Sequence, residues 1–274
     1  MSSGAVSTRP DTLRDRPIPF ATVRDTLAIA QRNLITYRRV PQLLVFSTIQ
    51  PVIFVLMFRY VFGGAIAAVW NGHPVPYVDF LMPGIFVQTV TFGALTTGVG
   101  LAEDLQKGLI DRFRSLPIAR SAVLLGRTWA DLVRNIFVVL LMAVVGFLVD
   151  WRISTNFVGL VAGLLLVLAF AYSLSWLFAI VGLISPDAET AQAASFPLLA
   201  PLVFASSAFV PVNTMPGWLQ AFANHQPVSA VCNAVRALTL GGPTRSYVIQ
   251  ALAWIIGIIV VCAPLAVRKY RQAT

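Results

Sequence analysis

The side chains that could do chemistry in this 274-residue chain are few, and none of them forms a nucleotide-binding or hydrolytic motif. A phosphate-binding P-loop needs a Gly-Lys pair followed by Ser or Thr, whereas the only lysines, Lys107 and Lys269, are followed by Gly and Tyr. The sequence also has no nucleophile elbow, no zinc-protease motif, and no carboxylate midway along an apolar run of the kind that proton-driven transporters use. We therefore expect no enzyme active site and no cofactor in this chain, so the energy for any transport must come from another molecule.

Metal binding is not expected either. The two cysteines, Cys232 and Cys262, have neither metal-ligand spacing nor the pattern of a disulfide framework. His73 and His225 fall in segments expected to be outer loops, without other ligands near them in the sequence. We interpret both histidines as ordinary loop residues.

One polar segment interrupts this apolar chain: the stretch EDLQKGLIDRFRSLPIAR, 103–120, is crowded with charges, although only 11% of all residues are charged. Read as a helix over 103–116, it places apolar side chains on one side and charged ones on nearly the opposite side. The apolar members are Leu105, Leu109, Phe113 and Leu116, and the charged members are Asp104, Lys107, Asp111 and Arg114. Gly108 weakens such a helix by about 1 kcal/mol relative to Ala, so we expect a joint there, and Pro117 ends the pattern.

This two-faced segment predicts a short lever on the cytoplasmic side of a membrane. Its apolar face would rest against the inner ends of membrane helices, and its charged face would project toward a soluble partner. The alternative interpretation is a solvated loop that only sets the orientation of the protein in the membrane.

A second group of charges lies at the start of the third apolar run. Arg127, Asp131 and Arg134 are spaced four and three residues apart, so a helix places all three on one face. We expect them in the helix turns nearest the cytoplasm. There they either pair with one another as a structural anchor or dock against a neighbouring helix.

The elements that position these residues must be membrane helices. With 57% hydrophobic residues and a mean hydropathy of +0.78, the chain is too apolar for an ordinary soluble domain. Its apolar runs reach about 20 residues, as membrane-crossing helices require, and they do not alternate in polarity as the strands of a membrane barrel do. The net charge of +9 does not indicate nucleic acid, because the basic residues mostly border the apolar runs. We predict an all-α polytopic membrane protein that binds no nucleic acid.

Six transmembrane helices fit the apolar runs. We place them at about 43–62, 80–102, 121–149, 157–184, 188–210 and 246–267. An even number puts both termini on one side, and the side that collects most basic residues is predicted to be the cytoplasm. These basic residues are the seven arginines before Leu43, then Lys107, Arg112, Arg114, Arg120, Arg268, Lys269 and Arg271.

Two further segments precede the first span. Residues 1–19 mix Arg, Asp, Ser and Pro without periodicity, which is typical of a disordered cytoplasmic tail. From Phe20 to Tyr37, apolar residues recur every three or four positions, which predicts an interfacial amphipathic helix in the headgroup plane. A helix packed on another protein domain fits the same pattern.

The fifth span and the segment after it are irregular. Ser185 is a candidate N-cap for the fifth span. Pro197 and Pro201 then free backbone carbonyls that must be satisfied inside protein, so this span is expected to line a partner or a pathway. Residues 211–243 are too long for a turn and too interrupted for a crossing. We expect two short re-entrant helices there, dipping into the outer leaflet, or an amphipathic cap on the outer surface.

Two stretches carry a resemblance to a known family: AEDLQKGLIDRFRSLPIARSAVLLGR after the second predicted span, and FVPVNTMPGWLQAFANHQPVSAVCNAVRALTLGGP after the fifth. With the order of the loops, they resemble the six-span permease subunits of bacterial type-2 ATP-binding-cassette (ABC) exporters, particularly the daunorubicin-resistance type. The resemblance extends from Phe20 to the end, which implies that 20–274 is a single ABC transporter type-2 transmembrane domain. The tail before Pro19 has no counterpart.

The resemblance implies that Glu103 to Pro117 form a coupling helix in a cleft of a separate ABC ATPase subunit, which would bind the ATP and Mg. The residues that it implies for transmitting motion are Glu103, Lys107, Gly108, Asp111, Arg112, Arg114 and Pro117. It also implies two ATPase chains and a permease dimer, whose second half is an identical copy or a paralogue. The implied location is a bacterial inner (cell) membrane, in contact with membrane lipid and with both termini cytoplasmic.

In such a dimer, the contact and the pathway would come mainly from the first, second and fifth spans. Apolar spans with scattered Gln, Thr and aromatic residues favour an amphipathic drug or lipid-like substrate over a small ion. The residues expected at the pathway or its gate are Gln88, Thr89, Phe92, Pro197 and Pro201. Two other classes are an ion-coupled secondary transporter and a membrane enzyme that modifies lipid, and the scarcity of carboxylates in the spans argues against both.

Overall fold

The computed structural model describes residues 31, 41–62, 70, 75–108 and 120–272, and most of them are helical. The elements are α2 (Pro41–Leu56), the π-helix η2 (Met57–Val61), α4 (Tyr77–Gln106), α6 (Arg120–Leu148), α7 (Phe157–Ile184), α8 (Ala188–Phe204), the 3₁₀-helix η3 (Val212–Thr214), α9 (Gly217–Asn224), α10 (Pro227–Leu240) and α11 (Thr244–Gln272). No strand occurs in these ranges, which confirms the all-α class for them. The predicted tail 1–19 and His73 lie outside the described residues, as does the predicted interfacial helix apart from Gln31.

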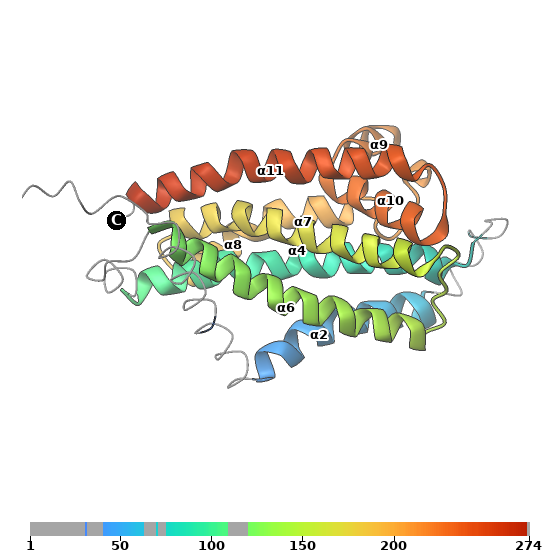
Figure 1. Ribbon diagram of the computed structural model, residues 1–274, viewed down its shortest axis with the longest axis horizontal. Helices are drawn as coiled ribbons and strands as arrows, with labels where there is room; N and C mark the ends of the chain where they lie inside the picture. The colour runs from blue at the N-terminus through green and yellow to red at the C-terminus, as the bar shows by residue number, and fades with distance from the viewer. Residues whose placement is uncertain (1–30, 32–40, 63–69, 71–74, 109–119, 273–274) are drawn as a thin grey trace, which may run out of the picture.

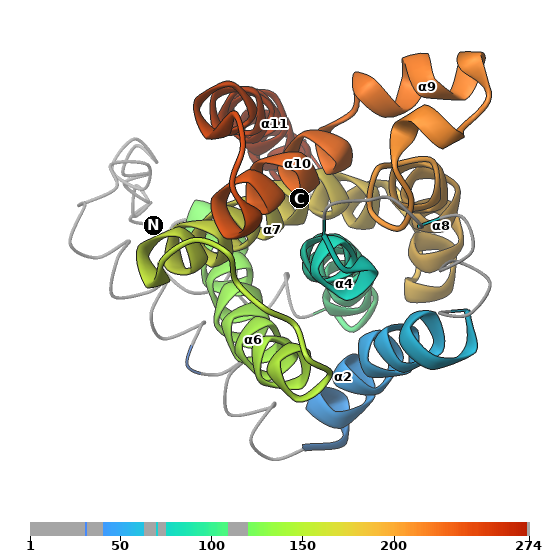
Figure 2. The ribbon, with the colours of Figure 1, turned by 90° about the vertical axis from the view of Figure 1, so that its right-hand side faces the viewer.

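The helix α4 lies at the centre of the bundle (Figure 1, Figure 2). Its middle carries apolar or small polar residues on every side, and all residues from 81 to 91 are buried. A helix of this composition is stable when other helices cover it all round. The helices α2, α6, α7, α8 and α10 all contact α4. The core around it includes Phe86, Met142, Phe170 and Leu174.

Two glycines allow the backbones of α4 and α7 to approach each other closely. A Cβ atom on Gly98 would overlap the carbonyl oxygen of Phe178, and a Cβ atom on Gly182 would overlap the carbonyl oxygen of Gly98. Helices in a membrane associate largely through close packing, which small residues permit. The two glycines therefore fix α7 directly against the central helix.

Four of the six predicted spans are long and apolar enough to cross a membrane. These are Tyr77–Gln106, Leu124–Leu148, Phe157–Ile184 and Thr244–Tyr270. The first predicted span, 43–62, corresponds to α2 and η2, whose apolar part Ser47–Val61 is shorter. The fifth corresponds to α8, which has 17 residues. The structure thus indicates a multi-pass membrane protein, and the number six stays a prediction.

Two helices end at other residues than the predicted spans. The second span was placed at about 80–102, and α4 continues to Gln106, so Glu103 lies in the last turns of the central helix. The fifth span was expected to reach Val210, but α8 ends at Phe204. Beyond α8, the amide of Ser207 donates to the Ser229 hydroxyl and that of Ala208 donates to the Ser206 hydroxyl, so this backbone bonds to side chains instead of continuing the helix.

The predicted cap of the fifth span is also wrong. The N-cap of α8 is Asp187, whose carboxylate accepts a hydrogen bond from the Thr190 amide at 2.7 Å. This bond lowers the pKa of Asp187 below its usual value. Ser185 instead ends α7, and its hydroxyl donates to the carbonyl of Val181. Asp and Ser are both good N-caps, so sequence preference alone did not choose between them.

The segment 211–243 contains two short helices, α9 and α10, at the end of the bundle away from the C-terminus (Figure 1). One side of α10 is apolar and packed into the core: Val228, Val231 and Val235 are at most 1% exposed, and Leu238 is partly buried. α10 packs against α7, α11 and α4. It is therefore part of the bundle rather than a surface cap, and its depth in the outer leaflet stays a prediction.

Candidate functional site

The charged segment begins at the last turn of α4. The Lys107 ammonium and the Glu103 carboxylate are 2.5 Å apart, and both side chains are at least half exposed. The hydrogen bond from Lys107 to Glu103 raises the pKa of Lys107, so this side chain is positively charged at neutral pH. An exposed pair at this helical spacing contributes little to stability. Both groups are thus accessible for contact with another molecule.

Gly108 ends the helix. Its φ is +63°, in the left-handed region that glycine adopts without strain, and its amide donates to the carbonyl of Leu105. No atom of the described residues lies within 4 Å of the position that a Cβ would take, so the positive φ is the reason for glycine that the structure shows. The remaining predicted coupling residues Asp111, Arg112, Arg114 and Pro117 lie outside the described residues.

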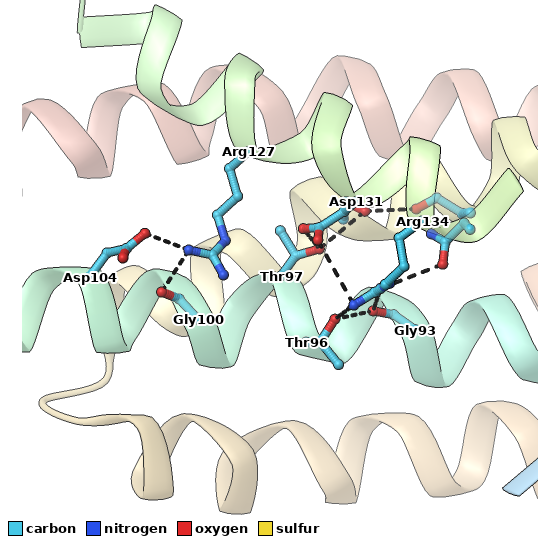
Figure 3. A network of polar contacts seen from close by, with 11 residues as sticks. Gly93, Thr96, Thr97, Gly100, Asp104, Arg127, Asp131 and Arg134 are labelled. Carbon is cyan, nitrogen blue, oxygen red and sulfur yellow. Dashed lines mark hydrogen bonds and ion pairs between the residues drawn. The ribbon is translucent and has the colours of Figure 1, made fainter. Parts of the chain in front are cut away.

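Directly behind Glu103, an ion pair joins α4 to α6. The guanidinium of Arg127 donates to the Asp104 carboxylate at 2.5 Å and to the Gly100 carbonyl at 2.8 Å (Figure 3). The two charged side chains are only 18% and 22% exposed. Charge-assisted bonds of this kind are roughly twice as strong as neutral ones. The last turns of α4 are therefore tied to the start of α6.

Further polar contacts continue along the same two helices. The Thr97 hydroxyl donates to the Asp131 carboxylate at 2.6 Å. The Arg134 guanidinium donates to the Gly93 carbonyl at 2.6 Å and to the Thr96 hydroxyl, and it lies 3.9 Å from Asp131. We call this set the α4–α6 polar ladder; its members are Gly93, Thr96, Thr97, Gly100 and Asp104 on α4, and Arg127, Asp131 and Arg134 on α6 (Figure 3).

The charged residues of α6 were expected either to pair with one another or to dock against a neighbouring helix, and they do both. Arg127 docks on α4, as does Arg134, and Asp131 and Arg134 also pair with each other. Asp131 is 2% exposed and lies toward the start of Leu124–Leu148, a helix long and apolar enough to cross a membrane. The α4 half of the ladder was missed, although positions 93, 97, 100 and 104 have helical spacing and small or polar side chains.

Next to the ladder, a cavity of about 330 Å³ lies between α2, α4, α6 and α8. Three of the predicted pathway residues, Gln88, Thr89 and Phe92, line it. Pro197 and Pro201 do not, and α8 contributes Gln192 and Phe196 instead. The wall toward α6 is made by Arg134 and Asn135, and that toward α2 by Ser47, Gln50 and Pro51.

A buried cation at the opposite end of the bundle was missed by sequence reasoning. The guanidinium of Arg236 on α10 lies 3.6 Å from the centre of the Phe80 ring and donates to the carbonyls of Phe80 and Ala208, each at 2.9 Å. It also donates to the hydroxyl of Ser207. Arg236 thereby holds α10 against the start of α4 and the chain that follows α8. The available signal was that Arg236 is the one charged residue in the sequence of α10.

Comparison with known proteins identifies the family. A family model described as ABC-2 type transporter matches residues 24–240. The chain belongs to the ABC-2 type transporter family. The resemblance carried by the two sequence stretches is thus confirmed.

Individual members of the ABC-2 family match over most of the chain. The chain is 35% identical to the daunorubicin resistance ABC transporter permease protein DrrB1 of Streptomyces coeruleorubidus, over 94% of this chain and 90% of that relative. It is 28% identical to the probable doxorubicin resistance ABC transporter permease protein DrrC of Mycobacterium tuberculosis, over 92% and 90%. It is also 28% identical to the putative transport permease ycf38 of Porphyra purpurea, over 79% and 74%. The ABC-2 match includes the end of α4, the polar ladder and all residues named at the cavity.

Proposed function

We propose that this chain is the transmembrane permease subunit of an ATP-driven exporter, which moves an amphipathic drug or lipid-like compound out of the cytoplasm or the inner leaflet. Membership of the ABC-2 family and the drug-resistance names of two relatives support this function. The sequence lacks a P-loop, which supports a separate ABC ATPase as the subunit that binds ATP and Mg.

The observation that carries the proposal is the ion pair between Asp104 and Arg127. Asp104 lies one residue from Glu103, at the point where α4 leads into the charged segment. A force that the ATPase applies to that segment would therefore act on α4 through its backbone and on α6 through Arg127. We propose that the residues in contact with the ATPase are Glu103, Lys107, Gly108, Asp111, Arg112, Arg114 and Pro117.

The complex that we propose has two ATPase chains and two permeases, the second being an identical copy or a paralogue. The permease would cross a bacterial inner membrane six times, with both termini in the cytoplasm. Closure of the ATPases on ATP would move the helices about the dimer axis, as in other rigid-body transitions. Gln88, Thr89 and Phe92 would contact the substrate, and the bends expected at Pro197 and Pro201 would let α8 act as a gate.

A second candidate is an ion-coupled transporter that works alone, and the buried Asp131 carboxylate favours it. Intramembrane carboxylates often mark proton pathways. Here, however, the Thr97 hydroxyl donates to Asp131 and the Arg134 guanidinium lies 3.9 Å away, so the carboxylate already contacts groups of its own chain. This arrangement supports a structural ion pair more than a proton carrier.

The test is transport in sealed vesicles that contain the chain alone or the chain together with its ABC ATPase partner. A fluorescent amphiphile would report accumulation, with ATP or a proton gradient as the source of energy. We expect accumulation that needs both the ATPase and ATP. Charge reversal at Asp111 and Arg114 should abolish it while the complex still assembles. Accumulation driven by a proton gradient without the ATPase would replace the proposal with the second candidate.

A further inference from the structure

We infer that the cavity between α2, α4, α6 and α8 binds an uncharged, hydroxyl-bearing head group, such as a sugar, of the transported amphiphile. The inference rests on the proposed function. It adds a binding site built within one permease chain, and it states the chemistry of the group that the site receives.

The first argument is a pair of buried polar atoms without hydrogen-bond partners. The Gln88 side-chain oxygen Oε1 and the Asn135 side-chain nitrogen Nδ2 have none in the described part of the chain. The two side chains are 1% and 3% exposed, and they line the same cavity from α4 and α6. Native proteins satisfy nearly all buried polar atoms, and these two face the same cavity, so a ligand in the cavity can supply a partner to both.

The second argument is the kind of partner that each atom needs. Gln88 Oε1 accepts a hydrogen bond and needs a donor, whereas Asn135 Nδ2 donates and needs an acceptor. The orientation of the Asn135 amide follows from its oxygen, which accepts from the Arg134 guanidinium at 3.5 Å. A hydroxyl both donates and accepts, so one or two hydroxyl groups satisfy both atoms. A carboxylate offers no donor and a quaternary ammonium offers neither donor nor acceptor.

The third argument concerns charge. Arg134 is the cationic residue on the cavity wall, but its guanidinium lies 3.9 Å from Asp131 and donates to the Gly93 carbonyl. The positive charge is therefore already compensated on the protein side. A charged head group would lose its hydration in the cavity and would find no uncompensated opposite charge to pair with. A neutral head group avoids this cost.

The size of the cavity fits a head group rather than a whole drug. Its volume of about 330 Å³ is at the lower end of the range for ligand pockets, about 300–1,000 Å³. Phe92 and Phe196 supply apolar surface beside the polar groups. The hydrocarbon part of an amphiphile would extend out of the cavity along the lipid-facing surface.

The experiment uses the full chain with its ATPase in lipid nanodiscs, without nucleotide. The probes are two amphiphiles with the same NBD-labelled alkyl chain, one ending in glucose and the other in trimethylammonium. Binding is read from NBD fluorescence anisotropy. We expect the wild type to bind the glucoside about tenfold more tightly than the ammonium compound, which corresponds to one or two hydrogen bonds. Gln88→Met and Asn135→Leu should each remove most of this preference.

A matched pair of milder variants controls for folding. The hydroxyls of Thr89 and Thr91 both bond within α4, to the carbonyls of Ile85 and Val87, but only Thr89 lines the cavity. Thr89→Val should weaken glucoside binding, and Thr91→Val should leave it unchanged. Equal effects of the two variants would count against the site.

The thermal stability of the empty complex separates a ligand site from a structural one. If Gln88 Oε1 has no partner without ligand, Gln88→Met should not lower the melting temperature, and only the rise that the glucoside produces should be lost. A lower melting temperature of empty Gln88→Met, with glucoside binding intact, would overturn the inference. Binding is measured without ATP, so the two proposals are tested separately. Absence of glucoside binding would contradict the site without contradicting ATP-driven export, and absence of export would contradict the proposed function while the glucoside still binds.

Discussion

Asp104 and Arg127 join the last turn of the central helix to the first turns of α6 through an ion pair that is less than a quarter exposed. The guanidinium of Arg127 also donates to the Gly100 carbonyl, one helical turn before Asp104. In a family whose movement we attribute to a separate ATPase, this pair lies where the force would enter the membrane helices. It is accordingly the first contact to test.

Removing either charge should weaken both the fold and the coupling. We expect Arg127→Met and Asp104→Asn each to lower the free energy of unfolding by about 1–3 kcal/mol, because a partly buried charge loses its partner. The double variant should cost less than the sum of the two, which a double-mutant cycle of thermal unfolding measures. Lys107→Met is the control for stability, since its exposed pair with Glu103 should contribute nothing measurable. Additive single effects would show that the pair does not couple the helices.

Gly98 and Gly182, at the contact between α4 and α7, should tolerate no side chain. Gly182→Ala places a methyl group against the carbonyl oxygen of Gly98, and two backbones cannot move apart without losing contacts along both helices. We expect a loss of about 1–3 kcal/mol, measured by thermal unfolding in detergent. Gly257→Ala on α11 is the matched control, because no atom in the described part of the chain lies within 4 Å of its added methyl group. A variant Gly182→Ala as stable as Gly257→Ala would contradict the close packing.

Gly108 should be replaceable only by residues that accept a positive φ. Asn adopts this conformation more readily than other residues, whereas a β-branched residue is strongly disfavoured. We expect Gly108→Asn to keep transport and Gly108→Val to redirect the charged segment, so that ATP hydrolysis continues without transport. The ratio of transported molecules to hydrolysed ATP measures this uncoupling. An unchanged ratio in Gly108→Val would remove Gly108 from the coupling residues.

Arg236 should be irreplaceable even by Lys. A lysine has no planar group to stack on Phe80 and cannot reach the carbonyls of Phe80 and Ala208 together. We expect Arg236→Lys to destabilise this end of the bundle by about 2–3 kcal/mol. In a Cys262→Ser background, the thiol of Cys232, which is 0% exposed, should then react faster with a maleimide. Equal reaction rates of Cys232 with and without Arg236→Lys would argue against the role of Arg236 in holding α10 against α4.

The sequence predicted the helical class and most helix positions because apolar runs have a length that only crossing helices explain. It failed where the deciding contact is distant along the chain. The α4 side of the polar ladder was missed because Thr and Gly are unremarkable inside an apolar run until Asp131 and Arg134 are placed opposite them. The early end of α8 follows from the side chains of Ser206 and Ser229, which bond to the backbone that leaves it. Gln88, Thr89 and Phe92 were singled out from composition and line the cavity, and their role in a pathway stays a prediction. Asn135 was not singled out, because its place at the cavity depends on the rotation of α6.

One property of α4 connects these observations. Its single proline, Pro83, precedes Gln88, so the helix from the cavity to Glu103 is uninterrupted over about 22 Å. A helix without such a break is stiff, and a shift at one end arrives at the other almost undiminished. Ligand binding in the cavity and ATPase binding near Glu103 would then both act on the position of α4. Bound ligand should therefore change the affinity for the ATPase by the same factor as bound ATPase changes the affinity for the ligand.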